Sequence, residues 1–319
     1  MDKRKKELLK ISDEIKKLID DKQKELSLTF VEDTHTYHIK KLDGEMTTKF
    51  PSVSSVIKQF YEEFPSLEKS LSMSDYDLMA QDKLLKEWKA TADYANSKGS
   101  RVHYLLETDL LEQYGSYKKV RKPIFECDEQ QTNDGNAMID AGHKFINLMH
   151  RRGAVLLDTE IILGSSVLKY TGQPDKVWLI YKGDELGFII TDWKTNKIKN
   201  FQVHHYTSPM LPPFESEMDT ALAHYKIQLP LYGRLLLDML KGTKYEKIKF
   251  FGCVIVHLTA NKTFAEYRVG SKFIDIVMNM DVLPRIDKVF EDKKTFEINE
   301  NNRIEKLKEY EKKDNWYSK

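Results

Sequence analysis

Two aspartates and a lysine in one short segment are spaced so that a folded hairpin would bring them together. Asp175 begins one apolar, β-prone run, Asp192 ends the next, and Gly183-Asp184 lies midway between them. A Gly-Asp pair in this position favours a two-residue hairpin with a type II′ turn. Counting equally from that turn places Asp175 opposite Asp192, with Cβ atoms roughly 4.5 to 5.5 Å apart. Lys194 follows two residues later and therefore shares the face of Asp192.

Opposed carboxylates suggest a metal site, because like charges facing one another on a sheet are destabilising unless a cation lies between them. Mg²⁺ or Mn²⁺ would serve, since hard cations prefer oxygen ligands and Mg²⁺ is commonly held by one or two carboxylates. Such an ion supplies what phosphodiester hydrolysis needs: a nucleophilic water, a neutralised phosphate and help for the leaving oxygen. Lys194 would orient or deprotonate the water and steady the phosphate charge. The alternative is an exposed hairpin with ordinary surface charges.

Strands interleaved with helices around this hairpin predict an α/β fold with a central mixed β-sheet flanked by helices. An N-terminal extension of a charged helix and short strands precedes it. The periodicity predicts helices over 1–26, 74–112 with a break near 97–100, 136–152 and around 228. It predicts strands over 155–163, 175–181, 187–195, 247–258 and 263–269. Residues 114–136 and 196–220 are expected to be irregular. The expected divisions are 1–26, 27–135, 136–295 and a helical tail over 296–319.

Four motifs in order resemble the RecB-like exonuclease branch of the PD-(D/E)XK nuclease superfamily. Pro174-Asp175 followed by Asp192-Trp193-Lys194 resembles the signature itself, within GQPD and DWKT. Upstream, SKGSRVHYLLE is similar to the glycine-to-histidine helix of that branch. Downstream, YKIQLPLYGRLL is similar to its QxxxY helix. The resemblance covers roughly residues 99 to 232 and implies a restriction-endonuclease-like core.

The resemblance also implies roles for individual residues. Asp175, Asp192 and Lys194 would be catalytic, and His103 would be a metal ligand or lie beside the metal. Gln228 and Tyr232, one helical turn apart, would line the site and contact the substrate. The implied activity is a Mg²⁺- or Mn²⁺-dependent deoxyribonuclease, an exonuclease acting on DNA ends in recombination, repair or replication, often in phages. An endonuclease, an RNA-acting nuclease and a catalytically silent nucleic-acid-binding or assembly protein are the alternatives.

Several other residues leave two interpretations open. Glu160 is either a third metal-binding carboxylate or an outward-facing strand residue. Trp193 alternates away from Asp192 and is expected in the core. Pro230 lacks a backbone donor and is expected to kink the helix of Gln228. The basic cluster at 118–122 is a solvated charge run or a phosphate contact, and the adjacent histidines at 204 and 205 are loop residues or DNA contacts.

The amino-acid composition limits the classes of protein to which this chain could belong. The 51 basic and 50 acidic residues nearly cancel, so any DNA-binding surface must be a local basic patch. Cys127 and Cys253 are the only cysteines, which excludes the four-cysteine iron–sulfur cluster of some RecB-like relatives. The charged N-terminus and the lack of a long apolar run predict no membrane association and a cytoplasmic protein, in the host cell if the chain is viral. The helix over 1–26 has one narrow apolar stripe, which either docks on the body or binds a protein partner.

Overall fold

A mixed five-stranded sheet forms the centre of the molecule, as the sequence predicts. The computed structural model describes residues 3–31, 34, 36–115, 125–197, 201 and 207–317. The strand order is β10-β9-β8-β7-β4, parallel between β8 and β9 and antiparallel at the other three pairings. The strands are β4 (Val155–Thr159), β7 (Lys176–Lys182), β8 (Glu185–Lys194), β9 (Lys249–Leu258) and β10 (Phe264–Arg268). The α/β architecture with helices on both faces is confirmed.

The β7–β8 hairpin has the register that the Gly-Asp turn predicts. Lys182 pairs with Glu185 across a two-residue loop, and Lys176 pairs with Thr191 at the other end. Gly183 has a φ of +61°, which the first central position of a type II′ turn requires and which glycine adopts without steric cost. Asp175, the residue before β7, is one position beyond this last pair, and Asp192 is the corresponding position of β8.

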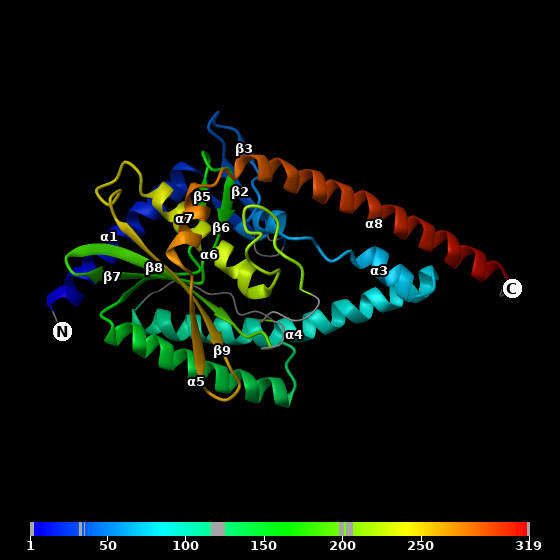
Figure 1. Cartoon of the computed structure of the whole chain (residues 1–319), viewed down its shortest axis with the longest axis horizontal. Helices are drawn as coiled ribbons and strands as arrows, with labels where there is room; N and C mark the ends of the chain where they lie inside the picture. Colours follow the sequence, from blue (N-terminus) through cyan, green and yellow to red (C-terminus); the bar gives the residue numbers. More distant parts are fainter. Residues whose placement is uncertain are drawn as a thin grey trace.

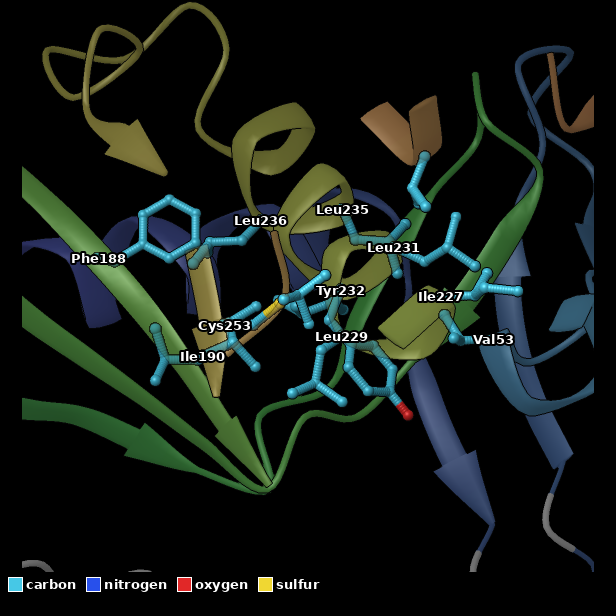
Figure 2. Close-up of a cluster of buried hydrophobic side chains, with 14 of the residues drawn as sticks. Val53, Phe188, Ile190, Ile227, Leu229, Leu231, Tyr232, Leu235, Leu236 and Cys253 are labelled. Carbon is cyan, nitrogen blue, oxygen red and sulfur yellow. The ribbon is translucent and has the colours of Figure 1, made fainter. Parts of the chain in front are cut away.

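Helices cover both faces of the sheet (Figure 1). Side chains along each strand alternate between the two faces and so contribute to two apolar layers. On one face, α4 (Leu78–Gln113) and α5 (Glu129–Arg151) pack against the even-numbered positions of β7, including Trp178. On the other face, α1 (Lys3–Glu25) and α6 (Ala221–Met239) cover the odd-numbered positions, including Val177. Figure 2 shows side chains of α6 meeting those of β8 and β9 in this second layer. Trp193 is fully buried in the first layer, as predicted.

The N-terminal region packs against the sheet. The apolar stripe of α1, with Leu8, Ile15 and Ile19, is buried against the body, and Ser12 Oγ donates to the carbonyl of Leu156 at 3.1 Å. Helix α1 therefore docks on the body of the protein, which is one of its two predicted roles. A protein partner would have to bind the charged outer face of this helix. Short strands and helices follow in the order β1 (Thr29–Val31), β2 (Thr36–Lys40), β3 (Met46–Thr47), α2 (Val53–Ile57), a 3₁₀ turn (Lys58–Phe60) and α3 (Ser66–Met73).

Two helices differ from their predicted bounds. The break expected near residues 97–100 is wrong, because α4 runs without interruption from Leu78 to Gln113. Gly99 lies where α4 passes the end of β8, and a Cβ there would come within 3.1 Å of Thr195 Oγ1. This glycine permits a close approach between two elements. Helix α5 begins at Glu129, capped by Asp128, seven residues before the predicted start at 136.

The remaining elements lie between β4 and β7 and in the C-terminal third of the chain. Residues 207–220 are irregular apart from a bridge between Pro209 and Met218, as expected for an inserted segment. The remaining elements are β5 (Leu163–Ser165), β6 (Tyr170–Gly172), α7 (Ser271–Asn279) and α8 (Leu283–Tyr317). The division expected at 295/296 falls inside α8, which extends along α3 and the start of α4 (Figure 1), with Arg303 Nη1 3.2 Å from Asp82 Oδ1. Among the helices of the described ranges, none is long and apolar enough to cross a membrane.

Candidate metal and phosphodiester site

The candidate site lies at the end of the β7–β8 hairpin opposite its turn. Asp175 directly precedes β7, while Asp192 and Lys194 are among the last three residues of β8. Helix α4 passes this end of the sheet on one side, and α6 packs over it on the other. The three central residues of the site therefore lie at the same end of the hairpin, as the sequence pattern predicts.

Asp175 and Asp192 are both buried, but they have different partners. Asp175 is 8% exposed, and its Oδ2 accepts the backbone N–H of Trp193 at 2.8 Å. Asp192 is 3% exposed, and its Oδ2 lies 2.5 Å from Lys194 Nζ. The lysine is thus held by one carboxylate, while the other carboxylate faces α4.

His103 presents one ring nitrogen to Asp175. Its Nε2 lies 3.1 Å from the carbonyl oxygen of Trp193, and because a carbonyl only accepts, Nε2 carries the proton. Nδ1 then lies 3.3 Å from Asp175 Oδ2. Burial lowers the pKa of His103, which favours the neutral ring and leaves a lone pair on Nδ1. At this distance the Nδ1 lone pair and the carboxylate oxygen could both coordinate one cation.

Glu160 faces His103 and Asp175 and not the solvent, while its role as a metal ligand stays a prediction. Ligand atoms of His103, Glu160 and Asp175 lie within 4.8 Å of one another. The residue follows β4 with a φ of +44°, a left-handed conformation that is uncommon outside glycine and that clusters at functional sites. Its backbone is fixed on both sides, since its N–H donates to the Asp175 carbonyl at 3.0 Å and its own carbonyl accepts from Gln173 Nε2 at 3.1 Å.

Glu107 is a fourth carboxylate of the site that was not predicted as a site residue. It is 7% exposed on α4, and its Oε1 accepts a hydrogen bond from Thr159 Oγ1 at 3.1 Å. The sequence places it four residues after His103, on the same helix face. That spacing was the signal: a carboxylate one turn from a candidate metal histidine, on an otherwise apolar face.

The electrostatics of the cluster favour a bound cation. Burial and the charge of Asp175 raise the pKa of Asp192 to about 6. Burial and Asp175 also raise the pKa of Glu160 well above its usual value. Burial alone would raise the pKa of Asp175 too, but nearby positive charges, first that of His103 when it is protonated at low pH and then those of Lys176 and Lys194, outweigh burial and hold that pKa low. Acidic side chains that are costly to ionise together are stabilised by a divalent ion, whose positive charge offsets their repulsion.

Lys194 remains a cation in this setting. Burial alone would lower its pKa, but Asp192, Tyr225 and Asp175 outweigh burial and raise it above the usual value. Its side chain keeps 16% of its surface exposed. A permanently charged ammonium beside a carboxylate cluster suits a phosphate oxygen better than a proton-transfer role.

The predicted substrate residues of α6 lie together beside this cluster. Gln228 Nε2 donates to Tyr232 Oη at 2.9 Å, as their spacing of one turn predicts. Burial and the charge of Asp192 raise the pKa of Tyr232. The helix continues through Pro230 from Ala221 to Met239, so the proline does not displace Tyr232 from the face of Gln228. Their contact with a substrate stays a prediction.

Two other predicted features lie outside the described residues: the basic cluster at 118–122 and the histidines at 204 and 205. No protein-family model and no curated protein matches this sequence, so the site has to be interpreted from its own geometry. That geometry provides nitrogen and oxygen ligands for a hard or borderline cation, next to a lysine and a glutamine–tyrosine pair. Such a set can bind a metal-activated water and a phosphate.

Proposed function

We propose that this chain is a Mg²⁺- or Mn²⁺-dependent DNA nuclease of the PD-(D/E)XK type, similar to RecB-like exonucleases. One observation carries the proposal: His103, Glu160 and Asp175 converge within 4.8 Å beside the Asp192–Lys194 ion pair. Neutral imidazole with carboxylate ligands suits Mn²⁺ and tolerates Mg²⁺. A structural salt bridge alone would not need three further acidic or imidazole groups facing it.

The architecture supports the same proposal. Asp175 and Asp192 lie at the open end of a hairpin at the centre of a mixed sheet, with the histidine helix on one side and the glutamine–tyrosine helix on the other. This is the arrangement expected of a restriction-endonuclease-like core. The order of the motifs along the chain and their convergence in space are independent facts, and together they favour the nuclease over an unrelated α/β fold.

Each side chain then has a defined task. His103, Glu160 and Asp175 would hold the metal, and Asp192 would add a carboxylate beside it. A bound divalent ion supplies a more acidic water and neutralises phosphate charge. Lys194 donates hydrogen bonds to a non-bridging phosphate oxygen and stabilises the negative charge that grows during attack. Gln228 and Tyr232 present an amide and a hydroxyl to the nucleic-acid backbone.

The decisive experiment compares end-labelled linear duplex DNA with covalently closed circular DNA in Mg²⁺ or Mn²⁺. We expect linear DNA to be degraded and closed circles to be spared. The Lys194→Ala variant should lose at least about 100-fold in turnover with DNA affinity changed by less than about 3-fold, as when a transition-state donor is removed. Lys182→Ala is the matched control, because it removes an exposed lysine from the opposite end of the same strand pair.

The results also separate the alternatives. Discrete fragments from closed circles would indicate an endonuclease, and preference for RNA would indicate an RNA-acting enzyme of the same fold. Salt-dependent DNA binding without cleavage in either metal would indicate a binding or assembly protein. Equal cleavage by wild type and Lys194→Ala would refute the mechanism. The same proposal includes a role in recombination, repair or replication and a cytoplasmic location, in the host cell if the chain is viral.

A further inference from the structure

Tyr225 of α6 touches two points of the strand end that carries Lys194. Its ring lies beneath the ammonium, with Nζ 4.0 Å from the ring centroid. Its hydroxyl donates to Asn196 Oδ1 at 3.3 Å. Lys194 is the last residue of β8, so Tyr225 contacts the chain both at that residue and just beyond it.

The same strand end is held from the opposite side by β9. His257, the register partner of Lys194, lies with its Nε2 2.7 Å from the carbonyl oxygen of Asn196 and donates to it. The ring of Phe201 stacks on His257, with centroids 4.7 Å apart and planes 11° from parallel. Phe201 also packs against Tyr225 at 5.9 Å. The stretch from Lys194 to Asn196 is therefore enclosed between α6 and β9.

A lysine needs such support to act at a fixed point. Its side chain is long and flexible, and the ion pair with Asp192 at 2.5 Å fixes the ammonium in one direction only. The electron-rich face of an aromatic ring attracts a cation and supplies a second, independent contact. Reaction rates depend steeply on such placement, and an error of about 1 Å can cost on the order of 100-fold.

We propose that Tyr225 is a positioning residue for Lys194: its ring holds the ammonium against Asp192, and its hydroxyl fixes the strand end through Asn196. The inference rests on the proposed nuclease function, in which Lys194 contacts the scissile phosphate. Tyr225 acts through Lys194, so it should affect turnover and not substrate binding. The aromatic ring carries most of the effect, because it makes the contact with the cation.

Steady-state cleavage of linear duplex DNA tests this role with three variants. Tyr225→Leu removes the ring and should lower kcat by 10- to 100-fold with KM within about 2-fold of wild type. Tyr225→Phe keeps the ring and should retain at least about a third of kcat. Tyr267→Leu is the control: Tyr267 also packs on Phe201, at 5.1 Å, and should keep wild-type kinetics. If Tyr225→Leu does not fold, Tyr225→Met replaces it with a chain of greater length.

A second readout does not depend on activity. In protein labelled with ¹³C-lysine, the ring current of Tyr225 should shift the ε-methylene signal of Lys194 upfield, with the signal identified by its loss in Lys194→Ala. The shift should persist in Tyr225→Phe and disappear in Tyr225→Leu. An unshifted wild-type signal, or unchanged kcat in Tyr225→Leu while wild type cleaves DNA, overturns the positioning role alone. Absence of cleavage by wild type in both metals overturns the nuclease proposal, and the positioning role with it.

Discussion

Replacing Asp192 by asparagine should stabilise the metal-free protein at neutral pH. Asparagine has nearly the shape of the acid, and its carbonyl can still accept from Lys194, but it carries no charge. Burial and Asp175 raise the pKa of Asp192 to about 6, even though Lys194 lies beside it. The ionised form is therefore less favourable in the folded protein than in the unfolded chain.

The magnitude follows from proton linkage. Relative to the usual 3.8, a folded-state pKa of about 6 corresponds to roughly 3 kcal/mol of stability. Below pH 3.8 the group is protonated in both states, so Asp192→Asn should change stability little. As the pH rises from 3.8 through about 6, the wild-type protein loses this free energy and the variant does not. The stability difference should therefore grow over that interval and level off near 1 to 3 kcal/mol at pH 8, the upper value being this linkage limit.

Urea denaturation in a chelator at pH 4, 6 and 8 measures the difference, with Asp175→Asn as the matched variant. The pKa of Asp175 lies below its usual value, so its ionised form stabilises the fold above pH 3.8 and that contribution is lost at lower pH. Asp175→Asn should accordingly destabilise at pH 8, opposite in sign to Asp192→Asn. A loss of more than about 1 kcal/mol in Asp192→Asn at pH 8 would refute the electrostatic account of the cluster.

Two further predictions concern the metal ligands. His103→Ala should weaken Mn²⁺ binding by calorimetry and lower cleavage, and excess Mn²⁺ should restore part of the activity, because the carboxylates remain; equal metal affinity in the variant would exclude Nδ1 as a ligand. Glu107→Gln keeps an acceptor for Thr159 but removes a negative charge beside the proposed ligands, which would attract the cation. Mn²⁺ affinity should therefore fall roughly 10-fold, as is typical when a group behind the ligands is changed, and unchanged affinity would make Glu107 purely structural.

The hairpin and its central residues were predictable from sequence because both depend on short-range rules. A two-residue turn fixes the register, and a period of two then fixes the face of every side chain. The pairing of Lys176 with Thr191 and the burial of Trp193 follow directly. The layered α/β architecture was predictable for a similar reason, since the hydrophobic periods change between strands and helices.

Other features depend on contacts that sequence spacing does not specify. Gly99 reads locally as a helix break, but α4 continues because packing against the sheet outweighs the weak helix propensity of one glycine. Glu160 turns inward only because its backbone adopts a positive φ after β4. Tyr225 meets Lys194 only because α6 packs back against the end of β8. No local sequence pattern predicts any of these three features.

The position of the site explains how the fold tolerates its buried charges. Isolated buried carboxylates are expensive, and the cost is least where water or a cation can reach them. Asp175 and Asp192 lie where the hairpin opens, beyond the last pairs of β7 and β8 and between the two apolar layers. The layers keep the strands and α4 in register, so the acidic groups cannot separate to relieve their repulsion. Protonation of Asp192 relieves it below about pH 6. In the proposed function a bound cation would relieve it at higher pH, at a site that this rigidity preorganises.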